Sequence, residues 1–145
     1  MTTFNILLLD GAYASSVALT IDILSASAAI ASGMKLQGPR WKVYSISGGD
    51  MQLSNGLRTS SHALAGKRLP KSGVWLIPGI GITSADMAQA RLAKPDVLAA
   101  SVMLAKLHSR GISLCASCSA VLLLAQAGLL AGKRATIAWW LAPLL

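Results

Sequence analysis

Short apolar runs alternate along this chain with stretches whose apolar residues recur at helical spacing. Four runs are typical of strands buried on both faces: 4–9, 41–46, 74–77 and 112–115. Four stretches are predicted helices: 15–33, 86–92, 95–110 and 121–127. Strands that alternate with helices in this way predict a mostly parallel sheet covered on both faces.

Glycine, proline and serine mark the predicted boundaries. Ser15 or Ser16 is expected to cap the first helix. A hairpin is predicted over 50–61 around Asn55-Gly56, and a last strand over 134–137. The loop over 78–81 is rich in residues that let backbone approach closely, and 116–119 is expected to form a sharp turn.

The composition indicates one apolar domain. Of the 145 residues, 54% are hydrophobic and only 12% are charged, so the chain has the apolar surface that a disordered chain lacks. All five acidic residues are Asp. A mechanism that depends on Glu is therefore excluded.

The basic residues raise the question of a nucleic-acid or membrane partner. Lys and Arg outnumber the acids by 13 to 5, for a net charge of +8. They are scattered, however, and the only adjacent pairs are Lys67-Arg68 and Lys133-Arg134. This distribution favours a solvated surface, so we expect neither direct DNA binding by this chain alone nor a membrane partner.

The N-terminus and the cysteines bear on the compartment. Residues 12–14 imitate a signal-peptidase site, but no basic residue precedes them and Asp10 interrupts the apolar stretch. Cys115 and Cys118 are too few for a disulfide framework. We therefore predict a cytoplasmic protein.

Cys118 is the principal candidate for chemistry. It lies between a predicted strand and the first turn of a helix, the arrangement of a nucleophile elbow, where the helix dipole favours a thiolate. Two other interpretations stay open: a small structural cysteine, and a redox dithiol with Cys115. His62 and His108 are not at metal-ligand spacing, so no metal and no cofactor are expected.

Several segments together resemble a known family. They are Ile6-Leu7-Leu8-Leu9-Asp10, Asp22-Ile23-Leu24, Ser54-Asn55-Gly56-Leu57, Leu76-Ile77-Pro78-Gly79, Cys118-Ser119-Ala120 and the stretch 127–136. On these residues the chain resembles the ThiJ/PfpI-type, class I glutamine amidotransferase-like domain. It is most similar to the version at the N-terminus of AraC-family (GlxA/FtrA-like) transcriptional regulators.

The resemblance covers residues 1–145 and implies an α/β fold, a flavodoxin-like three-layer sandwich with a mostly parallel sheet. The family continues into further strands and helices and then a helix-turn-helix region. We therefore expect a domain truncated at its C-terminus, without the DNA-binding part.

The resemblance also implies where a site lies. Cys118 takes the elbow position, and the backbone amides of Gly79 and Ile80 would face an anion or oxyanion. With Ser119, these residues form the expected ligand site. Ala12 and Tyr13 are further candidates for its walls.

Three departures from the family pattern argue against catalysis. Ser16 stands where the enzymes of the family place a Glu beside the cysteine, and Ala138 replaces the His of a frequent Thr-x-His-Trp. Ala120 replaces a glycine two residues after the cysteine, where it is expected to crowd the turn.

These observations predict a non-catalytic ligand-sensing and dimerisation domain related to AraC-type transcription regulators, acting as a homodimer with a possible small-molecule ligand. The alternative is a Cys118-dependent hydrolase or isonitrile hydratase-like enzyme. An inert truncated product is a third possibility.

Overall fold

The computed structural model describes residues 2–145, and its centre is one six-stranded sheet in the order β3-β4-β2-β1-β5-β6. The strands are β1 (Thr3–Leu7), β2 (Arg40–Ser45), β3 (Gly49–Gln52), β4 (Arg58–Ala63), β5 (Val74–Ile77) and β6 (Leu114–Ala116). All neighbouring pairs are parallel except β3 and β4, which are antiparallel. The predicted mostly parallel α/β fold is confirmed.

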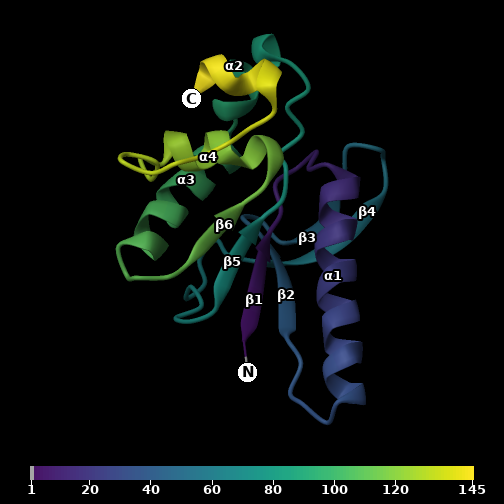
Figure 1. The fold of residues 1–145 in the computed structure, drawn as a ribbon. Helices are drawn as coiled ribbons and strands as arrows, with labels where there is room; N and C mark the ends of the chain where they lie inside the picture. Colours follow the sequence, from purple (N-terminus) through teal and green to yellow (C-terminus); the bar gives the residue numbers. More distant parts are fainter. Residues whose placement is uncertain (1) are drawn as a thin grey trace.

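Helices lie on both faces of the sheet and make three layers (Figure 1). They are α1 (Ala14–Gly33), α2 (Ala85–Leu92), α3 (Pro95–His108) and α4 (Val121–Gln126), with the short 3₁₀ helices η1 (Cys118–Ala120) and η2 (Trp139–Leu144). Helix α1 covers one face, and α3 and α4 cover the other.

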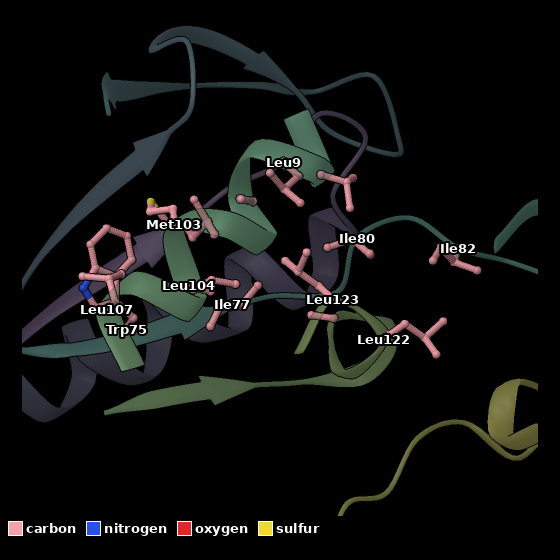
Figure 2. Packing of buried hydrophobic residues seen from close by; sticks show 14 of the residues in the cluster. Leu9, Trp75, Ile77, Ile80, Ile82, Met103, Leu104, Leu107, Leu122 and Leu123 are labelled. Atoms are coloured by element: carbon pink, nitrogen blue, oxygen red, sulfur yellow. The ribbon is translucent and has the colours of Figure 1, made fainter. Parts of the chain in front are cut away.

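Successive side chains of a strand point to opposite faces of the sheet, so the strands contribute to two separate hydrophobic cores. On β1, Leu7 belongs to the core beneath α3 and α4, which also holds Trp75, Leu104 and Leu123 (Figure 2). Ile6 belongs to the core beneath α1, with Leu8, Val17, Leu24 and Leu53. Both faces of β1 are therefore buried, which explains its continuous apolar sequence.

The α1 face is covered less completely than the α3 face. Leu76 of β5 is paired in register with Cys115 of β6, and the Cys115 side of β6 is exposed. Helix α1 itself leaves Leu19, Ile23 and Ile30 exposed at 61%, 56% and 65%. Apolar surface therefore remains open along α1 among the residues described.

Helix α1 is also long and apolar enough to cross a membrane by length and composition. A mostly buried core helix of a soluble protein and a signal sequence near the N-terminus pass the same test, and 17% of the apolar stretch of α1 is buried. Here Val17 and Leu24 of α1 are buried against the sheet, which is consistent with a soluble protein.

Most predicted elements occur close to their expected positions. The hairpin around Asn55-Gly56 is confirmed by the antiparallel pairing of Gly49–Gln52 with Arg58–Ala63. The predicted cap of the first helix is wrong, because α1 starts at Ala14 after Tyr13 and the amide of Ala14 donates to Ser54 Oγ.

The predicted last strand over 134–137 is also wrong. These residues form an irregular segment between a turn and η2. In Figure 1 this yellow segment runs past α4 toward α2 and does not lie beside a strand. Without a neighbouring strand there is no ladder of hydrogen bonds to define strand structure.

Candidate functional site

The turn after β6 holds Cys118 in a conformation that is rare for a residue with a side chain. Its φ is +54°, in the left-handed region where Cβ crowds the following carbonyl. The turn is fixed on both sides, because the amide of Ser117 donates to Ile77 O at 3.1 Å and the amide of Ala120 donates to Ser117 O at 3.1 Å. The strand-turn-helix connection thus presents an exposed Cys118 at the carboxyl end of β6.

A hollow of about 610 Å³ opens beside Cys118, between the turn and the first half of α1. Its walls carry hydroxyls and apolar groups but no ionised carboxylate, ammonium, guanidinium or imidazole. The lining residues are Tyr13, Ser15, Ser16, Leu19, Thr20, Ile23, Ser117 and Cys118. We call this space the Cys118 hollow.

The backbone amides of the neighbouring loop are already paired within the protein. Gly79 N donates to Ser16 Oγ at 3.1 Å, and Ile80 N donates to Ser119 Oγ at 3.0 Å. Ser16 Oγ also lies 3.3 Å from Ser117 Oγ. In this arrangement serine hydroxyls occupy the places where an anion would meet the two amides.

Tyr13 joins the start of α1 to the same loop. Its amide donates to Gly79 O at 2.9 Å, and its hydroxyl donates to Ile82 O at 2.8 Å. Burial, followed by the proximity of Cys118, raises the pKa of Tyr13 above its usual value. The phenol is therefore kept neutral and serves as a structural donor.

Gly79 is required here for a close approach. A Cβ at this position would meet Tyr13 Cδ2 at 2.9 Å and Cys118 Cβ at 3.2 Å. The prediction that this loop needs residues suited to close backbone contact therefore has a specific cause: the loop lies directly behind the cysteine.

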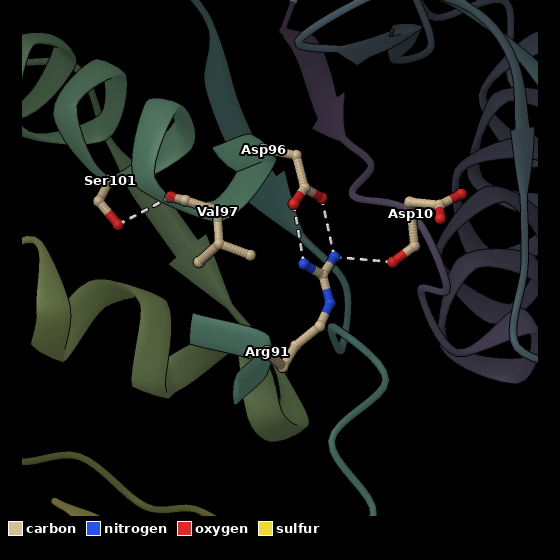
Figure 3. Close-up of polar contacts among 5 residues, drawn as sticks. All are labelled: Asp10, Arg91, Asp96, Val97 and Ser101. Atoms are coloured by element: carbon tan, nitrogen blue, oxygen red, sulfur yellow. Dashed lines mark hydrogen bonds and ion pairs between the residues drawn. The ribbon is translucent and has the colours of Figure 1, made fainter. Parts of the chain in front are cut away.

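An ion pair fixes the other side of the loop region (Figure 3). The guanidinium of Arg91 donates to both carboxylate oxygens of Asp96 at 2.9 Å and to Asp10 O at 2.7 Å. Burial alone would raise the pKa of Asp96, but the hydrogen bonds and charge of Arg91 outweigh it and hold that pKa below its usual value. Arg91 thus ties α2 and α3 to the segment that leads into α1.

The two histidines lie away from the Cys118 hollow. His62 is on β4, four places from β6 in the sheet, with its ring centroid 5.7 Å from that of Tyr44. His108 is the last residue of α3. Within residues 2–145, no group of three or more His, Cys, Asp or Glu side chains could hold a metal ion.

Ala120 does not crowd the turn as expected. Its φ is −65° with ψ −14°, an ordinary right-handed conformation that any residue adopts. Its side chain is fully buried in the core beneath α3 and α4. The strain in this turn lies at Cys118, two residues earlier.

The structure separates the sequence-predicted site residues into two groups. Of Gly79, Ile80, Cys118 and Ser119, only Cys118 lines the hollow, and the other three are buried behind it. Tyr13 forms a wall, whereas Ala12 is buried in the core beneath α1.

Helix α1 contributes further wall residues that were not predicted from the sequence: Ser15, Leu19, Thr20 and Ile23. One sequence feature could have indicated this contribution. The apolar residues of α1 are not confined to one side of the helix, so some of them remain outside the core.

Comparisons with known proteins bear on the fold. No family model matches the chain, and no curated protein matches it by sequence. Among solved structures, the AraC family transcriptional regulator from Pseudomonas putida is 16% identical with a TM-score of 0.76, over 99% of this chain and 70% of that one.

Two further structures carry related names. A candidate protease I from Bacteroides thetaiotaomicron is 10% identical with a TM-score of 0.75, over 99% of this chain and 78% of that one. A ThiJ/PfpI family protein from Pseudomonas syringae is 20% identical with a TM-score of 0.57, over 88% of this chain and 46% of that one. The chain therefore has the flavodoxin-like fold that AraC-family regulators share with ThiJ/PfpI proteins, as the sequence resemblance implied.

Proposed function

We propose that this chain is a non-catalytic ligand-sensing and dimerisation domain of the kind that AraC-type transcription regulators carry. The observation that supports this most strongly is the pairing of the Gly79 and Ile80 amides with Ser16 Oγ and Ser119 Oγ. Oxyanion stabilisation needs donors that point at the developing charge and are free to receive it. Two donors already satisfied by the protein do not meet that requirement.

The residues around Cys118 also lack a proton acceptor of the usual kind. A thiol nucleophile is activated by an adjacent base or by a nearby positive charge. The hollow is lined by hydroxyl, phenol and apolar groups, and both histidines lie elsewhere in the fold. Binding without turnover is the function that this set of side chains supports.

The ligand we expect is small and uncharged. A hollow of about 610 Å³ falls within the range of small-molecule sites, which are mostly apolar with a few polar groups that fix orientation. Leu19 and Ile23 supply apolar contact, and Ser117 supplies a hydroxyl. An ionised ligand would lose its hydration without gaining a counter-charge.

We propose that a homodimer forms through α1. Leu19, Ile23 and Ile30 are exposed at spacings of four and seven residues, so they lie along one side of the helix. A two-fold contact would place this surface against its own copy. Because Leu19 and Ile23 also line the Cys118 hollow, the second copy would cover the hollow, and ligand binding would be coupled to dimerisation.

Sedimentation equilibrium tests this proposal. We expect the wild-type chain to be a dimer and a Leu19→Asp/Ile23→Asp variant to be a monomer with unchanged circular dichroism. Val102→Asp is the matched control, because Val102 is an apolar residue that is 72% exposed on α3. A wild-type monomer, or equal loss of dimer in the control, would refute the α1 interface.

The second candidate function is a Cys118-dependent hydrolase or isonitrile hydratase-like enzyme. One observation favours it: Cys118 has φ +54° at a strand-to-helix turn, and backbone strain of this kind is often found at reactive sites. This function needs a cysteine that is a thiolate at neutral pH and a second group that moves protons. The first proposal, the ligand-sensing and dimerisation domain, also includes a cytoplasmic location and no direct DNA binding by this chain alone.

A further inference from the structure

A second hollow is lined mainly by basic side chains. It has a volume of about 400 Å³, and five of the chain's 13 Lys and Arg residues surround it. The lining residues are Lys67, Arg68, Leu69, Lys71, Lys106, Arg110 and Ile112. We call this space the basic hollow.

The five cations come from two segments that are far apart in sequence. Lys67, Arg68 and Lys71 lie in the loop between β4 and β5, whereas Lys106 lies in the last turn of α3 and Arg110 just after it. The sequence suggested scattered charges on a solvated surface. All five side chains are indeed exposed, but the fold brings them together around one hollow.

No carboxylate balances these cations within residues 2–145. The ion pairs of the described residues join Arg58 to Asp50 and Arg91 to Asp96, and no Asp lines the basic hollow. The carboxyl end of α3 carries a partial negative charge that favours Lys106 and Arg110 nearby. The loop cations have no such partner among the described residues, so they are available to bind an anion from solution.

The basic hollow is separate from the Cys118 hollow. Its loop leads into the amino end of β5, and α3 leads into the amino end of β6, whereas Cys118 follows the carboxyl end of β6. In a parallel pair these two ends lie at opposite edges of the sheet. A ligand in one hollow therefore does not contact the other.

We propose that the basic hollow binds a small soluble anion that carries several phosphate groups. Guanidinium and ammonium groups from two directions suit the several oxygens of such an anion, and Arg binds phosphate through paired hydrogen bonds. Leu69 and Ile112 give the hollow an apolar part beside the cations. The cations line one hollow of about 400 Å³ and do not form an extended stripe along a helix, which favours a compact anion over a duplex.

The chain supplies a matched control. The sequence Leu-Ala-Gly-Lys-Arg occurs at 64–68 and at 130–134. Both copies form the same turn, with Lys67 N donating to Leu64 O at 3.1 Å and Lys133 N donating to Leu130 O at 3.0 Å. Only the first copy contributes its basic pair to the basic hollow.

The test is calorimetric titration of the full chain with inorganic tripolyphosphate at constant ionic strength. We expect saturable binding that Lys67→Ala/Arg68→Ala weakens by about tenfold or more, which corresponds to the loss of about 1.4 kcal/mol or more. Lys133→Ala/Arg134→Ala removes the same net charge and should leave the affinity within about twofold of wild type. A Lys106→Ala/Arg110→Ala variant, whose changes lie on the other segment, should weaken binding like the first pair.

Three results would overturn the proposal: no saturable binding, equal weakening by the control pair, or tighter binding of a DNA duplex than of tripolyphosphate. Equal weakening would indicate attraction by net charge alone. Tighter duplex binding would indicate an extended surface. Circular dichroism of each variant separates a lost site from a lost fold.

Discussion

The two ends of the parallel strands, called here the carboxyl edge and the amino edge of the sheet, differ in how their polar groups are paired. At the carboxyl edge, the Cys118 hollow is lined by hydroxyl, phenol, thiol and apolar groups, and the nearby amides of Gly79 and Ile80 are paired with serine hydroxyls. At the amino edge, five cations surround a hollow without a carboxylate. At the carboxyl edge the loop amides are hydrogen-bonded within the protein, whereas at the amino edge no carboxylate among the lining residues pairs with the five cations.

This difference matters for what each edge can select. A site whose donors are already satisfied gains little from a charged ligand and discriminates by shape and apolar contact. A site with unpaired charge attracts any anion and discriminates by the number and placement of its charges. Substitutions at the first edge should therefore act through close packing and internal hydrogen bonds, and substitutions at the second should act through charge.

The largest effect is expected where two loops meet at the carboxyl edge. Gly81 has φ +72°, and a Cβ there would collide with the backbone oxygen of Gly11. Gly81→Ala should lower the free energy of unfolding by about 2–4 kcal/mol, measured by urea denaturation.

The control is Gly132→Ala. Gly132 has a similar φ of +71° but open space around it, so we expect a loss of about 1 kcal/mol from backbone strain alone. Equal losses in the two variants would show that the contact between the loops adds nothing to stability.

The Arg91–Asp96 ion pair should give a pH-dependent effect of intermediate size. Arg91→Met should cost about 1–3 kcal/mol at neutral pH, because three charge-assisted hydrogen bonds, two to Asp96 and one to Asp10 O, are lost and Asp96 is left without its partner.

The direction of the pH dependence follows from the lowered pKa of Asp96. The stabilisation is complete above the ordinary Asp pKa of about 3.9, and it is lost as the pH falls through the lower pKa of the folded state. The difference between wild type and Arg91→Met should therefore shrink in strong acid, and Asp96→Asn should remove that pH dependence. A difference that stays constant into strong acid would contradict the role assigned to this pair.

Ser119 and Ser16 should differ although each accepts one amide hydrogen bond. Ser119 is fully buried, so Ser119→Ala leaves the Ile80 amide unpaired and should cost about 1–3 kcal/mol. Ser16 borders the Cys118 hollow, where water can replace its hydroxyl, so Ser16→Ala should cost less. Urea denaturation of both variants measures the order, and the reverse order would refute the internal pairing described here.

The smallest effect is expected at the amino edge. Lys71→Ala removes one of five neighbouring cations, and this one lies in the loop between β4 and β5 and not at the carboxyl end of α3, so the melting temperature should rise slightly at low salt, and the gain should vanish as salt screens the repulsion. Lys133→Ala, outside the basic hollow, should show a smaller gain. A fall in the melting temperature at low salt would mean that Lys71 makes a stabilising contact instead.

The sequence predicted the parts of the fold that depend on neighbouring residues. Apolar runs located the strands, Asn55-Gly56 located the hairpin, and the small residues of 116–119 located the turn at Cys118. Strand boundaries, turns and helical spacing are encoded within a few residues of each other. These predictions therefore needed no tertiary information.

The details of the two hollows could not be predicted in the same way. Ser16 Oγ accepts from an amide 63 residues away, and nothing near Ser16 in sequence distinguishes this role from a helix cap. The basic hollow likewise combines Arg68 with Arg110, which only the pairing of β5 with β6 brings together. The segment 134–137 has a strand-like sequence, but strand formation depends on a neighbour that the local sequence does not specify.

The central claim is that the Cys118 hollow binds without catalysis, and the reactivity of the cysteine tests it most directly. The measurement is the rate of Cys118 alkylation by iodoacetamide as a function of pH, in a Cys115→Ser background, with N-acetylcysteine as the reference thiol. We expect Cys118 to be alkylated no faster than the reference thiol at neutral pH. A rate that is already maximal below neutral pH would reveal an activated thiolate, contradict the non-catalytic function and favour the enzyme.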